Sequence, residues 1–261
     1  MTIEPMKITE VGMLPVTVYR SNEDMGEAAA AAAAEIIKAV VAAKGAANII
    51  IATGNSQLTF LQSLRQTEGI DWSKVTIFHM DEYIDLPPGH PASFPTFLER
   101  HLLDHIPEPA AFYPVRARAG QLEKDCADYA GLLRQHPADL CAMGIGENGH
   151  IAFNDPPYAE FEDPVWVKVV RLDEISRKQQ VGEGHFNSLE EVPTHAITLT
   201  IPALLAADKV LCIVPEARKA EAVYQALHGP VTESCPASIL RKTGNVHLYL
   251  DPEAAAKGLP K

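Results

Sequence analysis

Three residues that can transfer protons follow short apolar runs of the sequence. Asp81 comes directly after the run VTIFHM, and His150 lies in a glycine-rich stretch after the run LCAM, with Asp155 shortly beyond it. A carboxylate that holds an imidazole in one tautomer is a common arrangement in general acid–base catalysis. We therefore predict a proton-transfer site that contains Asp81, His150 and Asp155.

Asp81 is followed by a second acid, Glu82, and by a phenol, Tyr83. A carboxylate at the end of a buried strand can move a proton in sugar chemistry. The alternative is that one acid caps a loop while the other is solvated, and this fits Glu82 better than Asp81. A lone histidine is more often structural, but the position of His150 at a strand end in a glycine loop favours function.

A turn that can bind an anion is predicted at residues 53–56 (TGNS), between the apolar run NIIIA and a helical pattern. Gly54 permits a tight turn, and Ser56 can cap the helix that follows. Free backbone N–H groups at a helix N-terminus, together with the side chains of Thr53, Asn55 and Ser56, suit a phosphate. The alternative is an ordinary turn between a strand and a helix.

Lys219 lies in the first turn of another predicted helix, after the apolar run VLCIV. A lysine there opposes the helix dipole unless an anion is bound nearby. Lys219 is therefore a candidate phosphate ligand. The alternative is a solvated lysine on the surface.

These candidates need elements that bring them together. An amphipathic helix is predicted to begin after Ser21, which can cap it, and to end at Gly45. The apolar face of this helix is predicted to consist of Met25, Ala29, Ala32, Ile36 and Val40.

Short apolar runs alternate with helical segments along the rest of the chain, as is typical of strands buried on both faces of a parallel sheet. The pattern predicts an α/β fold with a doubly wound, mostly parallel sheet flanked by helices, a Rossmann-like three-layer sandwich. We expect one domain over residues 1–261. Such sheets bind ligands beyond the carboxyl ends of their strands. The strands are predicted at residues 48–52, 75–80, 140–143, 196–199 and 210–214.

The charge balance restricts the class of partner. The chain of 261 residues has 22 Lys plus Arg against 34 Asp plus Glu, a net charge of −12. This argues against nucleic acid or an anionic membrane as the main partner, and an anionic small substrate needs a local positive site. The sequence shows no signal-peptide pattern and no apolar stretch long enough to span a bilayer, so we expect a cytoplasmic protein.

We expect neither a cofactor nor a metal. The glycines of the stretch GIGENG match the dinucleotide-binding pattern only in part, and no helical pattern follows them. The cysteines are far apart in sequence and are expected to be reduced thiols rather than a disulfide framework or a zinc site. They are Cys126, Cys141, Cys212 and Cys235.

Two longer motifs carry a family resemblance: MDEY at residues 80–83 and GIGENGHIAFNDP at residues 144–156. With TG at 53–54, Lys219 and PASIL at 236–240, they cover nearly the whole chain in order. The sequence thereby resembles the glucosamine-6-phosphate deaminase family, part of a superfamily that includes 6-phosphogluconolactonases. The lactonase pattern has an arginine in place of Tyr83 and a different run after its Gly-His, so this sequence is more similar to the deaminases.

The resemblance implies conversion of glucosamine 6-phosphate and water to fructose 6-phosphate and ammonia, without a metal or redox cofactor, as in N-acetylglucosamine catabolism. It implies that His150 assists ring opening and that Asp81 moves a proton between C2 and C1. Asp155 then orients His150, and Asn148 has a supporting part. Phosphate contacts from residues 53–56 and Lys219 would hold C1 and C2 against these groups.

The sequence departs from the family pattern at three places. Asn148 stands where many members have an aspartate. Asp155 replaces the usual glutamate, and a shorter carboxylate leaves room for a water between it and His150. A phosphate-binding arginine, expected a few residues after Arg177, has no clear counterpart. The residues that might replace its charge are Arg218, Arg241, Lys178 and His185.

Three other functions remain open on sequence grounds. They are a galactosamine-6-phosphate deaminase, a hydrolase of the 6-phosphogluconolactonase type, and a sugar-phosphate sensor without catalysis. No residue can be tied to the epimeric hydroxyl that separates the two amino sugars. The family includes monomers and hexamers, so a homo-oligomer is compatible with the sequence.

Overall fold

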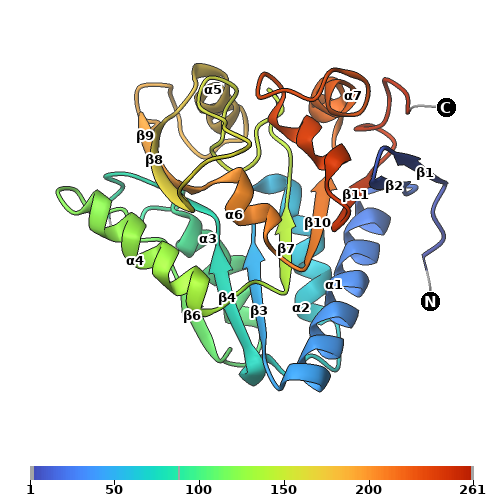
Figure 1. Ribbon diagram of the computed structural model, residues 1–261, viewed down its shortest axis with the longest axis horizontal. Coiled ribbons are helices and arrows are strands. Elements are labelled where there is room, and N and C mark those ends of the chain that lie inside the picture. The colour runs from blue at the N-terminus through green and yellow to red at the C-terminus, as the bar shows by residue number, and fades with distance from the viewer. Residues whose placement is uncertain (1–2, 88, 260–261) are drawn as a thin grey trace.

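The computed structural model describes residues 3–87 and 89–259. Within this part of the chain, eight strands form one sheet in the order β1-β2-β11-β10-β7-β3-β4-β6, with helices on both faces (Figure 1). β1 pairs with β2 in antiparallel orientation, and the other neighbours are parallel. The strands are β1 (Lys7–Val11), β2 (Leu14–Val18), β3 (Ala47–Ile51), β4 (Val75–His79), β6 (Ala111–Tyr113), β7 (Leu140–Met143), β10 (Lys209–Val214) and β11 (Val246–Leu250).

The sheet is wound in two directions from its centre. From β3 the chain adds β4 and then β6 on one side, and from β7 it adds β10 and then β11 on the other. The segments that leave β3 and β7 therefore diverge, and a crevice opens between them at the carboxyl ends of the strands. The predicted doubly wound, mostly parallel sheet is confirmed, and it brings residues 53–57 and 144–150 to the same edge.

Two groups of helices complete the three layers. One face of the sheet packs against α1, α2 and α3, and the other packs against α4, α6 and α7. A helix of nine residues, α5, lies apart from both groups, above the carboxyl ends of the strands (Figure 1). The helices are α1 (Asn22–Lys44), α2 (Leu58–Gln66), α3 (Phe94–His101), α4 (Leu122–Gln135), α5 (Glu174–Gly182), α6 (Ile201–Leu205) and α7 (Ala220–His228).

The ends of α1 are confirmed, but its predicted buried face is partly wrong. Ser21 Oγ accepts from Asp24 N–H at 3.1 Å, and Gly45 ends the helix with φ 84°. Met25 and Ala29 are buried as predicted. The helix packs against α2 as well as the sheet, so its buried stripe is turned from the predicted one. The stripe continues through Ala30, Ala33 and Ile37, while Ala32, Ile36 and Val40 are only partly buried.

The strand predicted at residues 196–199 does not belong to the large sheet. It is part of β9 (His195–Leu199), the central strand of a separate antiparallel sheet between β5 (Asp81–Tyr83) and β8 (Val167–Arg171). A short apolar run indicates a strand that is buried on both faces. It does not show which sheet that strand belongs to. Asp81 pairs with Thr198 in this small sheet, so the sheet fixes the backbone of Asp81.

The cysteines agree with the expected core thiols in part. Cys141 on β7 and Cys212 on β10 are buried, and Cys126 and Cys235 are partly buried; all are free. In the described ranges, the helices are too short or too polar to cross a membrane.

Candidate active site

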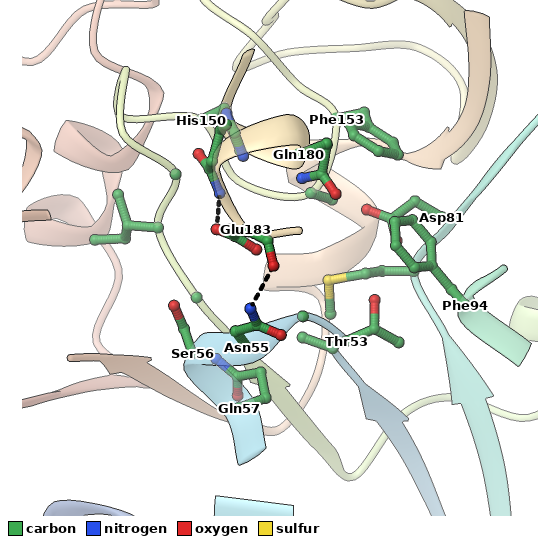
Figure 2. Close-up of a pocket in the computed structure, with 18 of the residues that line it drawn as sticks. Thr53, Asn55, Ser56, Gln57, Asp81, Phe94, His150, Phe153, Gln180 and Glu183 are labelled. Carbon is green, nitrogen blue, oxygen red and sulfur yellow. Dashed lines mark hydrogen bonds between the residues drawn. The ribbon is translucent and has the colours of Figure 1, made fainter. Parts of the chain in front are cut away.

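A small pocket lies at the crevice between β3 and β7, with a cavity volume of about 90 Å³ (Figure 2). The turn after β3, the end of β4, the loop after β7 and α5 contribute its walls. Of the predicted site residues, Asn148 and Asp155 do not reach the cavity and lie behind His150. Those that line it are Thr53, Gly54, Asn55, Ser56, Asp81, His150 and Lys219.

His150 is held through its Nδ1 atom. This nitrogen lies 2.8 Å from Asn148 Oδ1, 2.9 Å from Ser176 Oγ and 3.1 Å from Asp155 Oδ1. Amide and carboxylate oxygens only accept hydrogen bonds, so the neutral ring carries its proton on Nδ1 and presents Nε2 as an acceptor. The prediction of a water between Asp155 and His150 is wrong. The distance of 3.1 Å between Asp155 Oδ1 and His150 Nδ1 leaves no room for one.

Asp155 is the buried centre of this arrangement. Its Oδ1 accepts from Ser176 Oγ and from Asn148 Nδ2 (3.1 Å), and its Oδ2 accepts from the Asp173 N–H at 3.1 Å. Burial raises the pKa of Asp155, but the hydrogen bonds and charge of His150 and the hydrogen bonds from Ser176 and Asn148 outweigh burial and hold the pKa below its usual range. Asp155 is thus an anion that can orient His150.

Ser176 was not found by sequence reasoning. It lies on α5, and no spacing relates that helix to the loop of His150. The hydroxyl reaches both Asp155 and His150 only because α5 docks over the ends of the strands. A serine on a helix is by itself too common to indicate such a contact.

The loop that follows His150 is fixed to the small sheet. Phe153 N–H donates to Thr198 Oγ at 3.1 Å, and the buried Asn154 donates through Nδ2 to Leu199 O at 2.8 Å. Ala152, directly before Phe153, adopts φ 51°, a left-handed conformation that costs roughly 1–2 kcal/mol for a residue other than glycine. β9 therefore holds the backbone of Asp81 and the loop of His150 together.

Asp81 enters the pocket as a carboxylate with little support. It is 7% exposed, and none of the described residues donates a hydrogen bond to its side chain. Burial, and then the charge of Glu82, raise the pKa of Asp81 well above its usual range. A carboxylate without solvation is a stronger base than one in water.

The alternative of a structural acid fits Glu82, although it is buried rather than solvated. Glu82 is buried, and its two oxygens accept from Tyr83 N–H at 2.8 Å and from Ser93 Oγ at 2.6 Å. Burial raises the pKa of Glu82 to about 7, although these hydrogen bonds oppose the increase. Glu82 faces away from the pocket and is a structural residue of β5.

The pocket is also lined by a buried cation. Lys219 is 2% exposed, and no ion pair or hydrogen bond joins its ammonium to any residue that the structure describes. Burial lowers the pKa of Lys219. The alternative of a solvated surface lysine is therefore wrong, and a buried cation of this kind attracts an anion.

The turn after β3 lies beside Lys219. Gly54 adopts φ 94°, and residues 55–57 form a short 3₁₀ helix before α2. The predicted cap by Ser56 is wrong. The N-terminus of the 3₁₀ helix and the N-terminus of α2 both lack a side-chain cap. The Ser56 side chain lines the pocket instead, where it is available to a ligand.

The residues considered as substitutes for the missing arginine separate into two groups. Arg241 donates to the carbonyl oxygens of Leu227 and Gly229, and Lys178 is exposed and paired with Glu174. Neither of these two cations lines the pocket. Arg218 and His185 both contact Glu183, a pocket residue that the sequence did not single out.

A substitution at Gly146 is expected to displace the His150 ring. A Cβ atom at Gly146 would lie 2.0 Å from Cε1 and 2.1 Å from Nε2 of His150. We expect Gly146→Ala to lower kcat/KM by about 100-fold, because misplacing a catalytic group by about 1 Å costs that much. Steady-state kinetics and thermal unfolding would measure activity and stability. Gly131→Ala in α4, where a Cβ meets nothing within 4 Å, is the control and should keep full activity. A fully active Gly146→Ala protein would contradict this placement of His150.

Among the residues described, no group of three or more His, Cys, Asp or Glu side chains is arranged to hold a metal ion. The side chains that converge on the cavity are an unsolvated carboxylate, an oriented imidazole and a buried ammonium. Fold and site thus define an α/β protein with an acid–base pocket at the switch point of a doubly wound sheet, lined also by a buried lysine.

The chain belongs to the family described as glucosamine-6-phosphate isomerases/6-phosphogluconolactonase, whose model matches residues 20–248. The glucosamine-6-phosphate deaminases of Bacillus thuringiensis (strain Al Hakam) and Bacillus cereus (strain AH820) are each 38% identical over 239 residues, 92% of this chain and 87% of theirs.

Two solved structures illustrate the same fold. A monomeric glucosamine-6-phosphate deaminase superposes with a TM-score of 0.85 at 30% identity, over 92% of this chain and 98% of the other. A 6-phosphogluconolactonase from Shewanella baltica OS155 gives a TM-score of 0.73 at 20% identity, over 95% and 99%. The second similarity concerns the fold alone.

Proposed function

We propose that this chain is a glucosamine-6-phosphate deaminase, which converts glucosamine 6-phosphate and water to fructose 6-phosphate and ammonia. The observation that carries the proposal is the polarity of the pocket. Lys219, buried and in no ion pair or hydrogen bond with the described residues, lines the same cavity as Asp81 and His150. A hexose phosphate anchored by its phosphate at Lys219 directs C1 and C2 to the acid–base groups.

The first step is ring opening. His150 Nε2 exchanges a proton between the anomeric hydroxyl and the ring oxygen, which yields the open-chain aldehyde. The imidazole of His150 can do this because its Nδ1 is bound by Asp155 and Asn148, which leaves Nε2 free to face the sugar. Asn148 and Asp155 act through His150 and are positioning residues.

The second step is the movement of a proton from C2 to C1. The Asp81 carboxylate removes the C2 proton while O1 takes a proton from the substrate's own ammonium group, giving an enolamine, and the return of the first proton to C1 leaves a protonated imine at C2. Water adds to this imine, and ammonia leaves to give the ketose. The raised pKa of Asp81 makes it a stronger base for the first transfer and an acid for the second.

The phosphate end is proposed to consist of Lys219 and residues 53–56, through backbone N–H groups and the Thr53, Asn55 and Ser56 side chains. We further propose that one domain carries this activity in the cytoplasm, as part of amino-sugar catabolism. The net charge of −12 supports a small sugar phosphate as partner rather than nucleic acid or an anionic membrane.

The test is an assay panel. Glucosamine 6-phosphate, galactosamine 6-phosphate and 6-phosphogluconolactone are incubated with the protein, and ammonia, ketose phosphate and lactone hydrolysis are each measured. We expect ammonia and ketose phosphate in equal amounts from glucosamine 6-phosphate. Turnover of another member of the panel alone, or tight sugar-phosphate binding without any turnover, would contradict the proposal.

A further inference from the structure

A carboxylate lines the same pocket as Lys219. Glu183, the residue that ends α5, has a side chain only 4% exposed, and it lies between His150 and Asn55 in Figure 2. Its backbone oxygen accepts from Asn55 Nδ2 at 3.1 Å, which joins it to the proposed phosphate turn. A fixed negative charge is unexpected where an anion should bind, because like charges repel strongly in a buried site.

The contacts of this carboxylate are those of an oxyanion site. Glu183 Oε1 lies 2.8 Å from Gln179 Nε2 and 3.2 Å from Arg218 Nη1. Gln179 is itself oriented, because its Oε1 accepts from the Glu147 N–H at 3.1 Å and so directs Nε2 toward Glu183. A phosphate oxygen at the position of Oε1 would meet the same two donors.

Arg218 has carboxylate neighbours other than Glu183. Its guanidinium also pairs with Glu216, and Glu147 lies 3.8 Å away, so it stays in place when Glu183 leaves. Burial raises the pKa of Glu183, but His185, Lys219, Arg218 and Gln179 together lower it below its usual range. Glu183 is therefore an anion at neutral pH.

The cavity is small for a hexose phosphate, and Glu183 is one of the side chains that limit it. Sites for small molecules usually measure about 300 Å³ or more. The cavity of about 90 Å³ is smaller than this, so lining side chains must move before a hexose phosphate fits. Since Glu183 ends a helix, rotation of its side chain clears the Oε1 position without moving the strands.

We propose that Glu183 occupies the place of one phosphate oxygen in the free protein, and that a bound phosphate displaces it and takes Arg218 and Gln179 as ligands. The inference rests on the proposed function, in that the anion is a phosphate. Arg218 then replaces the missing family arginine, and Glu183 is a built-in competitor that sets the affinity for phosphorylated ligands.

Titration calorimetry with inorganic phosphate and with glucose 6-phosphate tests this without turnover, since glucose 6-phosphate has no amino group to lose. We expect Glu183→Gln to lower both dissociation constants about ten-fold and Arg218→Gln to raise them about ten-fold. Glu174→Gln and Lys178→Gln are the matched controls. They remove the same charges from α5, where both side chains are more than half exposed, and should change the constants less than two-fold.

Unchanged or weaker phosphate binding in Glu183→Gln would overturn the competitor role, and unchanged binding in Arg218→Gln would overturn the ligand role. If Glu183→Gln does not fold, Glu183→Ala gives the same test, because it also vacates the Oε1 position. Failure of the proposed deaminase activity is a separate result, since the panel of substrates measures turnover and calorimetry measures binding.

Discussion

Asp81→Asn is expected to lower the turnover of glucosamine 6-phosphate by about 10²–10⁴-fold, the usual contribution of a positioned acid–base group. The amide is nearly the size of the carboxyl group but cannot take a proton from C2. Ketose phosphate and ammonia should fall together, because the imine that releases ammonia forms only after this transfer. Coupled assays of both products, at saturating substrate, measure the effect.

The same substitution should make the protein more stable at neutral pH. Burial raises the pKa of Asp81 in the folded chain, so the ionised carboxyl costs stability above that pKa, and the cost disappears below the pKa of the unfolded chain. We expect a higher unfolding midpoint for Asp81→Asn at pH 8, with the difference shrinking as the pH is lowered.

Binding provides the control for Asp81→Asn. The dissociation constant of glucose 6-phosphate should change little, because the phosphate end of the pocket is intact. Turnover equal to that of the unmodified protein would remove Asp81 from the mechanism. A loss of stability at pH 8 would instead show that the carboxylate has a structural role.

Lys219→Met is expected to raise KM for glucosamine 6-phosphate by about 100-fold or more, since a buried charge pair with the phosphate is worth several kcal/mol. The turnover number should fall less than kcat/KM, because Asp81 and His150 are untouched. Burial lowers the pKa of Lys219, so the ammonium costs stability at neutral pH. The variant should therefore unfold at a higher temperature.

Steady-state kinetics and thermal unfolding check both parts of this prediction. Lys178→Met removes an exposed cation of the same kind from α5 and should leave KM unchanged. If KM for Lys219→Met stayed within about three-fold of its original value, the phosphate would have to bind elsewhere.

The strand-end residues were predictable because one topological rule covers them. The segments after β3 and β7 meet at the switch point whatever their side chains are, so residues 53–56 and His150 could be placed from sequence. The contact between His150 and Asp155 was also accessible, since both residues belong to one loop. Asp81 was placed in the pocket, although the small sheet that fixes it was not foreseen.

Contacts made by α5 were not predictable. Ser176, Gln179 and Glu183 reach the site because this helix docks over the strand ends, and no spacing along the chain encodes that distance. The burial of Glu82 was not predictable for a different reason. An acid at a strand end is by default expected in water, and the hydroxyl of Ser93, from another segment, is one of the two donors that accompany its burial.

The attachment of both reacting groups to β9 has an evolutionary consequence. Asp81 pairs with Thr198, and Thr198 Oγ accepts from the Phe153 N–H in the loop of His150. The spacing of proton donor and acceptor thus depends mainly on backbone hydrogen bonds within one small sheet. Substitutions on α5 that keep Ser176 leave this spacing in place, so the end of the pocket near Arg218 and Glu183 can change separately from the groups held by β9.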